Sequence, residues 1–312
     1  MKIKVLKFGG TSVGSVEAIK RSANIICDWS KKSKVIVVLS AMSGETDRLI
    51  NLTKSFSKSP NPVDFDNAIS TGENLSCALM SIYLNNQKTK SKSLHSWQIP
   101  IMTSSEHMKS RILSINKKFL LNELENLDVL VVPGFQGINE RREITTLGRG
   151  GSDTSAVAVA AAMDAECIIY TDVEGVFTTD PNIVPNAKKI NKISYEEMLE
   201  LASQGAKVLQ TRSVELAMRK NTKLSVRSSL KPKKIGTIIT DEKSVLEKNT
   251  VSGIAYTKDE AKITLSRVLD KPGVSSKIFG PLAKGNINVD MILQNLSLIH
   301  ISEPTRQTLI SY

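Results

Sequence analysis

Residues 7–12, with the sequence KFGGTS, place a lysine, two glycines and two hydroxyl groups directly after a strand-like stretch. Glycine lets backbone N–H groups approach an anion closely, and the N-terminus of a following helix adds about half a positive charge. Lys7 would supply a mobile positive charge to a phosphoryl group in transfer. The same residues also fit an ordinary tight turn beside a surface lysine, and they lack the GxxxxGK[ST] pattern of a Walker A loop.

Residues 148–155, GRGGSDTS, repeat this arrangement ahead of a second helix-like stretch. Arg149 could hold a carboxylate through two parallel hydrogen bonds. Ser152 and Asp153 could instead cap the following helix, which is the usual role of these residue types there. Two such segments in one chain favour an anion site over two unrelated turns.

Three further segments carry polar groups whose role the residues alone leave open. Glu73 could bind an ammonium group, but the helix dipole also favours an acid in a first helical turn. Residues 171–172 and 177–181 are rich in turn-forming residues, and Lys207 has the default interpretation of a surface lysine.

The elements that would position these residues alternate between strand-like and helix-like patterns. Strands are predicted at 3–8, 35–39, 128–132 and 167–170, helices at 16–29 with Ser15 as N-cap and at 156–163, a turn at 9–14 and a loop at 54–62. This alternation predicts an α/β sandwich with a mainly parallel sheet. Ligands bind beyond the carboxyl ends of strands in such sheets, so five loops are expected to share one crevice: 7–14, 40–46, 134–137, 148–153 and 171–180.

Composition limits the possible classes of protein. The 312 residues suggest about two domains, and 40% hydrophobic with 23% charged residues is typical of a folded soluble protein. No apolar run reaches the ~20 residues that a bilayer requires. The cysteines Cys27, Cys77 and Cys167 are scattered without a CxxC pair, which indicates a reducing, cytoplasmic location. Cys27 and Cys77 lie in helix-like, partly apolar stretches, which predicts buried rather than nucleophilic thiols.

The net charge of +11 leaves two classes open, a cytosolic enzyme or a basic binding protein. Only 4% of residues are aromatic, and they do not cluster with lysines as nucleic-acid stacking would require. The positive charge could instead attract small anionic substrates. We therefore expect neither a nucleic-acid partner nor a membrane partner, and no metal site, because the three histidines lack ligand spacing.

Taken together, the motifs resemble those of the aspartate kinase family in the amino-acid-kinase superfamily. They occur in the family's order over residues 2 to about 297, as segments 7–12, 40–44, 71–73, 148–153, 171–173, 178–181 and 205–209. The resemblance implies a three-layer α/β sandwich. It also implies ATP-dependent phosphorylation of the side-chain carboxylate of L-aspartate to 4-phospho-L-aspartate, the first step towards lysine, threonine and methionine.

The resemblance assigns roles residue by residue. Lys7, Glu73 and Asp153 are the expected catalytic residues, with Lys7 neutralising the phosphoryl group and Asp153 orienting Lys7 or the substrate. The expected aspartate contacts are Ser40, Thr46, Glu73 to the ammonium, Arg149 to a carboxylate, and Ser152. The expected ATP contacts are Lys7, Phe8, Gly9, Gly10, Thr171, Asp172, Phe177, Thr178, Thr179, Asp180, Pro181, Asn182 and Lys207.

The implied chemistry agrees with the residue types present. A carboxylate acceptor with a pKa near ~4 is already ionised at neutral pH, so no general base is needed. Catalysis then depends on positioning and positive charge. Mg²⁺ would bridge the ATP phosphates without a protein ligand set. Asn182 stands where the family usually has arginine, which removes one expected phosphate contact.

A composition change at residues 230–249 predicts a boundary between a catalytic domain, 1–245, and a regulatory segment, 251–297. The second segment has a β-α-β start with a strand at 261–265, a turn at 270–273, a helix at 274–284 and a strand at 287–292. It resembles the first ACT module of the family, which implies effector contacts for lysine or threonine at Asp270, Ser275, Asn288 and Gln294.

The family pattern ends near residue 297, and residues 298–312 form a tail outside it. We therefore expect an incomplete ACT region with an unpaired strand edge and without tight feedback inhibition. The family forms homo-oligomers through ACT pairing. Alternatives are another amino-acid kinase, acting on glutamate, acetylglutamate or a nucleoside monophosphate, and a non-catalytic ACT-type amino-acid sensor; residues 71–73 and the ACT start argue against the first.

Overall fold

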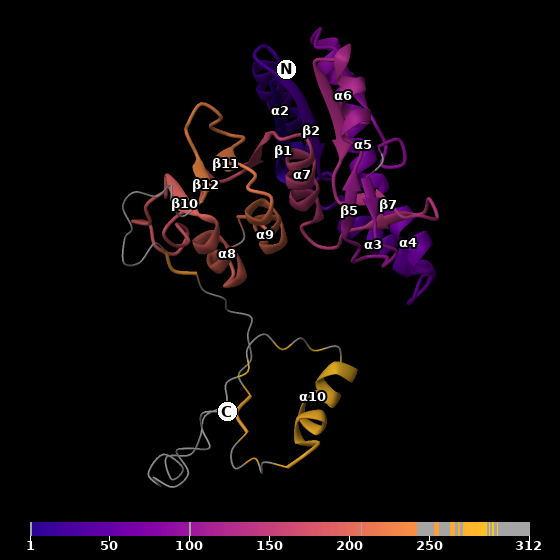
Figure 1. Cartoon of the computed structure of the whole chain (residues 1–312), viewed down its shortest axis with the longest axis vertical. Coiled ribbons are helices and arrows are strands. Elements are labelled where there is room, and N and C mark those ends of the chain that lie inside the picture. The colour runs from indigo at the N-terminus through magenta and orange to yellow at the C-terminus, as the bar shows by residue number, and fades with distance from the viewer. Residues whose placement is uncertain are drawn as a thin grey trace. The chain divides into compact units, whose positions relative to one another are not determined.

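The structure is a computed structural model that describes residues 2–99, 101–206, 208–241, 253–255, 263–265, 268, 271–285, 287, 289 and 292. The chain divides into two compact units, Met1–Lys258 and Asp259–Tyr312. In Figure 1 the colour runs from indigo to orange along the first unit, and the helix α10 of the second unit is yellow.

Two sheets lie in the first unit. The main sheet has the strand order β10-β12-β11-β9-β1-β2-β6-β3, and its pairs are parallel except β11 with β12; the second has the order β5-β4-β7-β8. The strands are β1 Ile3–Phe8, β2 Lys34–Leu39, β3 Ser91–Ser93, β4 Ile101–Thr103, β5 Ile112–Ile115, β6 Val129–Pro133, β7 Gln136–Ile138, β8 Ile144–Thr146, β9 Glu166–Thr171, β10 Lys192–Ser194, β11 Leu224–Ser228 and β12 Thr237–Thr240.

Helices cover both faces of the main sheet. They are α1 Gly10–Val13, α2 Val16–Ser30, α3 Glu45–Phe56, α4 Pro62–Ile69, α5 Thr71–Asn86, α6 Lys117–Glu125, α7 Gly151–Ala162, α8 Tyr195–Ser203 and α9 Thr211–Arg219. Side chains of α2 and α5 form one hydrophobic core with the sheet, and side chains of α6, α7, α8 and α9 form the other. The predicted three-layer α/β sandwich with a mainly parallel sheet is confirmed.

Alternation along β1 decides which layer each side chain faces. Val5 belongs to the core that contains α7, whereas Leu6 and Phe8 belong to the core that contains α2 and α5. Because successive strand residues point to opposite faces, Lys7 points towards α7. The continuous apolar runs of β2 and β6 follow from the same geometry, since each strand is buried on both faces.

Most predicted elements of the first unit are present. The four predicted strands correspond to β1, β2, β6 and β9 within one residue at each end. Helix α2 begins as predicted, and the hydroxyl of Ser15 accepts a hydrogen bond from the N–H of Ala18 at 3.2 Å.

Three local predictions were wrong. The turn 9–14 contains the short helix α1, and the loop 54–62 is shorter because α3 extends to Phe56 and α4 begins at Pro62. Helix α7 begins at Gly151 rather than at residue 156, since Gly150 in the left-handed region (φ 72°) ends the preceding loop there. Proline at the first position of α4 fits a helix start, because its missing N–H has no partner there in any case.

In the second unit the predicted helix is present as α10, Val274–Lys284, preceded by Gly273 at φ 87°. Of the two predicted strands, 261–265 and 287–292, residues 261, 262, 288, 290 and 291 lie outside the described residues, and the described ones, 263–265, 287, 289 and 292, are not in a strand. The helix-like stretch 241–247 and the tail 298–312 also lie outside the described part, apart from residue 241.

Candidate active site

The carboxyl ends of β1, β2 and β9 lie side by side and bring three predicted segments together. Phe8 pairs in register with Leu39 of β2 and with Tyr170 of β9. Gly9 therefore lies between the residues that follow these partners, Ser40 and Thr171. The N–H of Ser40 also donates to the carbonyl of Phe8 at 3.2 Å.

The loops after β1 and β2 pack directly against each other. A Cβ on Gly10 would lie 3.0 Å from the carbonyl oxygen of Ala41 and 3.4 Å from the backbone nitrogen of Ser43. A larger residue at position 10 would separate the two loops. Gly10 is thus required by a close backbone approach, whereas a Cβ on Gly9 would meet only Nζ of Lys7, at an ordinary 3.5 Å.

Lys7 and Asp153 form an ion pair at 2.6 Å between Nζ and Oδ1. Their side chains are only 12% and 11% exposed, so the pair joins the end of β1 to the first turn of α7 in a nearly buried position. The alternative of a surface lysine beside an ordinary turn is wrong. Asp153 holds the ammonium group of Lys7 beside the loops that follow β1 and β2. Removing either partner would leave an uncompensated charge in a nearly buried position.

The N-terminus of α7 adds Ser152 to this cluster. Gly150 is the N-cap, so the alternative in which Ser152 and Asp153 cap the helix is wrong, and both lie in its first turn. A Cβ on Gly134, after β6, would lie 2.7 Å from Cβ of Ser152, so the loop after β6 also abuts this turn. Arg149 is exposed and borders a cavity of about 300 Å³, whose other lining residues are Ala202, Gly205, Ala206, Leu209, Gln210 and Thr211.

Glu73 lies buried in the first turn of α5, with 3% of its surface exposed. Its Oε1 accepts a hydrogen bond from the N–H of Ala41 at 3.0 Å, and its Oε2 has no hydrogen-bond partner. Burial raises the pKa of Glu73 to about 7, against the lowering effect of the Ala41 hydrogen bond. A carboxyl oxygen that is buried and unpartnered beside the β2 loop is suited to receive a ligand cation. Thr46 is half-buried in the first turn of α3, which follows that loop.

Ser229, which the sequence analysis did not single out, connects β9 to Ser12 of the β1 loop. Ser12 donates to the hydroxyl of Ser229 at 2.9 Å, and Ser229 donates to the carbonyl of Thr171 from both its N–H (2.8 Å) and its hydroxyl (3.0 Å). Ser229 follows β11, and its place beside β1 depends on the strand order, for which the sequence carries no local signal.

The other predicted nucleotide contacts differ in exposure and in their hydrogen-bond partners, and Lys207 lies outside the described residues. The side chain of Phe8 is fully buried and stacks on Tyr170 at 4.9 Å between ring centres, so any nucleotide contact would have to come from its backbone. Asp172 and Asp180 are exposed, and Oδ1 of Asp180 accepts a hydrogen bond from the N–H of Asn182 at 2.8 Å within an exposed turn.

Phe177 and Thr178 pair with Lys189 and Lys188, which lie outside the named strands. Phe177 forms an isolated bridge with Lys189, and Thr178 exchanges hydrogen bonds with Lys188. Thr179 is half-buried and Pro181 is exposed. Lys207 lies outside the described residues, although its neighbours Gly205 and Ala206 line the cavity beside Arg149.

The predicted effector contacts are placed only in part, and of the two cysteines predicted to be buried, Cys77 is buried whereas Cys27 is half-buried. Ser275 is exposed on α10, whereas Asp270, Asn288 and Gln294 lie outside the described residues. Cys77 is buried, and burial raises its pKa well above the ordinary value, which makes the thiol unreactive. Within the described ranges, no three histidine, cysteine or carboxylate groups come close enough together to hold a metal ion.

Comparison with known proteins identifies the family. The sequence model of the amino acid kinase family matches residues 2–228, and that of the ACT domain matches residues 266–303. Aspartate kinase of Pseudomonas putida is 50% identical over 300 residues, which are 95% of this chain and 73% of that protein. The chain belongs to the aspartate kinases of the amino acid kinase family.

Solved aspartate kinases share this fold. Escherichia coli aspartokinase III in complex with aspartate and ADP superposes with a TM-score of 0.70 at 25% identity, over 95% of this chain and 77% of that one. The same enzyme in complex with lysine and aspartate has a TM-score of 0.74, with 94% and 77% covered. The Synechocystis aspartate kinase is 40% identical, with a TM-score of 0.68, and 92% of this chain matches 49% of that one.

The membership decides between the alternatives raised by the sequence. An aspartate kinase is favoured over a kinase for another amino acid, over a sensor without catalysis and over a nucleic-acid binder. None of the helices in the described part of the chain has the length and apolar character needed to cross a membrane.

Proposed function

We propose that this aspartate kinase transfers the γ-phosphoryl group of ATP to the side-chain carboxylate of L-aspartate, giving 4-phospho-L-aspartate. The observation that carries the proposal is the ion pair of Lys7 with Asp153 at 2.6 Å, which lies where the loops after β1, β2 and β6 meet the first turn of α7. The related E. coli enzyme binds aspartate and ADP.

The acceptor explains why no general base is assigned. A side-chain carboxylate with a pKa near ~4 is already a nucleophile at neutral pH. The task is to bring two anions into line, and Lys7 lowers that repulsion at the transferring group. Asp153 keeps the amine of Lys7 in place, and Gly9 and Gly10 direct backbone N–H groups towards the phosphates.

The aspartate itself is assigned to the side of the cluster formed by α5 and α7. Glu73 receives the ammonium group through its unpartnered Oε2. Arg149 holds a carboxylate through two parallel hydrogen bonds, and Ser40, Thr46 and Ser152 complete the pocket. Thr171, Asp172, residues 177–182 and Lys207 hold the nucleotide in this proposal.

Mg²⁺ is proposed to enter with ATP and to neutralise charge on its phosphates. Asp153 is the acidic side chain beside Lys7, and its Oδ1 is paired with that lysine. The residues therefore fit an ion held mainly through phosphate oxygens rather than by a protein cage.

Regulation and assembly are proposed from the second unit. Lysine or threonine is the proposed effector, bound by Asp270, Ser275, Asn288 and Gln294 of an ACT module at 251–297 that follows the catalytic domain, 1–245. Lysine is bound by the related E. coli enzyme. We also propose that the protein forms a homo-oligomer. We further propose that it acts in the cytoplasm, where the free cysteines Cys27, Cys77 and Cys167 would stay reduced.

The test is an acceptor comparison. The chain is incubated with ATP, Mg²⁺ and hydroxylamine, and acyl-hydroxamate is measured with L-aspartate or L-glutamate as acceptor. Hydroxamate is expected with aspartate and not with glutamate. Equal product with both, or product with glutamate alone, would assign the chain to another acceptor.

A further inference from the structure

Asp66, on α4, is a fully buried carboxyl group outside the proposed substrate contacts. Its Oδ2 accepts hydrogen bonds from Nδ1 of His107 (2.9 Å), the N–H of Met108 (3.1 Å) and the N–H of Thr146 (3.0 Å). Its Oδ1 accepts the hydroxyl of Thr146 at 2.7 Å. A buried carboxyl is costly unless donors surround it, so these four bonds hold α4 and two other segments together.

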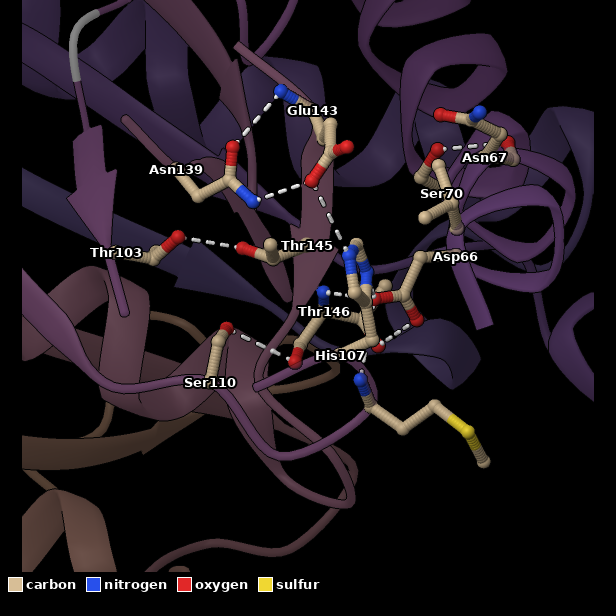
Figure 2. A network of polar contacts seen from close by, with 12 residues as sticks. Asp66, Asn67, Ser70, Thr103, His107, Ser110, Asn139, Glu143, Thr145 and Thr146 are labelled. Atoms are coloured by element: carbon tan, nitrogen blue, oxygen red, sulfur yellow. Dashed lines mark hydrogen bonds and ion pairs between the residues drawn. The ribbon is translucent and has the colours of Figure 1, made fainter. Parts of the chain in front are cut away.

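His107 extends this network to the β7–β8 hairpin, as Figure 2 shows. Its Nε2 lies 3.6 Å from Oε2 of Glu143, so the ring lies between the two carboxyl groups. Asn139 donates to Oε2 of Glu143 at 2.7 Å, and this bond is the main cause of a lowered pKa for Glu143. Asn139 also accepts the N–H of Glu143 at 2.9 Å, which fixes the turn of the hairpin.

On one side, the network fixes the end of β8, three residues before Arg149. Thr146 is the last residue of β8, and its carbonyl accepts hydrogen bonds from the N–H (3.0 Å) and hydroxyl (2.9 Å) of Ser110. Arg212 donates to the carbonyls of Leu147 (2.9 Å) and Ser110 (2.8 Å). The segment that carries Arg149 is therefore anchored at Leu147, two residues before the arginine.

The other end leads directly to Glu73. Helix α4 ends at Ile69, and α5 begins two residues later with Glu73 in its first turn. The carbonyl of Ser70, between the helices, accepts a hydrogen bond from Nε2 of Gln136 at 2.9 Å. Asp66 thus joins the segment that carries one charged substrate contact to the segment that carries the other.

We propose that Asp66, assisted by His107, is a positioning residue that holds Glu73 and Arg149 at the separation required by the ammonium and carboxylate groups of the amino-acid substrate. The inference rests on the proposed function, because it takes those two residues as the substrate contacts. Asp66 acts through the backbone on either side of the pocket and touches no substrate. Its loss affects binding of the amino acid and leaves nucleotide binding intact.

Asp66→Asn tests this assignment. The variant keeps the volume of the side chain, but an amide group cannot accept all four hydrogen bonds. We expect KM for aspartate to rise at least ~10-fold, with KM for ATP within about twofold of the parent, because a misplacement near 1 Å can cost ~10²-fold.

A purely structural role predicts a different pattern. An unfolded fraction lowers kcat and leaves KM unchanged, since the remaining molecules are intact. Thr103→Val is the matched control. It removes the buried hydroxyl contact between Thr103 of β4 and Thr145 of β8 (2.5 Å), and neither residue bonds Asp66. It is expected to lower the melting temperature without raising KM for aspartate.

A pair of variants at His107 keeps the inference testable if Asp66→Asn fails to fold. The amide nitrogen of His107→Asn lies close to the position of Nδ1 and can still donate to Asp66, whereas His107→Leu cannot. We expect the leucine variant to raise KM for aspartate and the asparagine variant to restore most of the loss. An unchanged KM in every folded variant of the two sites overturns the inference. Failure of the parent chain to phosphorylate aspartate overturns the proposed function, and the inference with it.

Discussion

Glu73 carries the titratable group whose state should follow substrate binding. Its pKa of about 7 arises from burial, with Oε2 unpartnered, so the free protein holds this carboxyl largely neutral below neutral pH. An ammonium group placed beside it would favour the ionised form. Binding of aspartate should therefore lower this pKa and release a proton near pH 7.

The first prediction concerns pH. KM for aspartate should fall as the pH rises through about 7, because only the ionised form of Glu73 pairs with the ammonium group. Initial rates from about pH 6 to about pH 8 measure this, with KM for ATP as the internal reference. Glu73→Gln should raise KM and remove its pH dependence. An unchanged pH profile in that variant would remove Glu73 from the ammonium site.

A second residue-level prediction concerns Lys7. Lys7→Ala should lower kcat about 10²- to 10³-fold, since a positive charge at the transferring group is lost. Asp153→Asn should lower kcat in the same direction by releasing Lys7. Lys4→Met is the matched control on the same strand, because Lys4 pairs with Glu166 instead. Equal losses of kcat in the Lys7 and Lys4 variants would contradict the role of Lys7.

At this scale, motifs predicted much of the candidate cluster. Lys7, Gly9, Gly10, Ser152 and Asp153 are brought together, because each lies next to a strand end or a helix start that its neighbours in sequence define. Ser229 and Asp66 could not be found in this way. Their partners are far away in sequence, and a serine or aspartate there is equally compatible with a turn or a helix cap.

At the level of elements, the first turn of α7 depends on the loop after β6. Gly134→Ala would place a Cβ 2.7 Å from Cβ and 2.9 Å from Cα of Ser152, so helix and loop must move apart. We predict a loss of ~10- to ~10²-fold in kcat/KM for aspartate. Gly280→Ala is the control, because nothing lies within 4 Å of a Cβ there. Full activity of Gly134→Ala would show that the loop tolerates the shift.

The elements that could be predicted are those with a strong pattern. The buried strands β2 and β6 are continuous apolar runs, and α2 has an apolar face and a serine cap. The early start of α7 was missed because Gly151, Ser152 and Asp153 are poor helix formers, and burial in the sandwich overrides that preference. Strands β4, β7 and β8 have three residues each, too few for an alternation to be recognised.

For the whole molecule, the strand order is what assembles the site. β1 lies between β2 and β9, which are far from each other in sequence, and this order could not be read from local patterns. The parallel arrangement itself was predictable, since alternating strands and helices place the strand ends at one edge. The rule predicts that the loops after the strands lie at one edge of the sheet. It does not predict which loops touch, such as Gly10 with Ala41 or Gly134 with Ser152.

The net charge of +11 also acts at this scale. If the charge attracts anionic substrates, KM for ATP should rise severalfold between about 0.05 M and about 0.5 M salt, as screening shortens the range of the field. A neutral osmolyte at matched osmotic strength should leave KM unchanged. A KM independent of salt would limit the role of the charge to solubility.

The central claim is that the ends of β1, β2 and β9 and the start of α7 form one site for nucleotide and amino acid. A crystal structure with ADP and L-aspartate tests it most directly. The account predicts ADP phosphates within about 3.5 Å of Nζ of Lys7 and aspartate between Glu73 and Arg149. Aspartate bound elsewhere, or phosphates held away from Lys7, would contradict it.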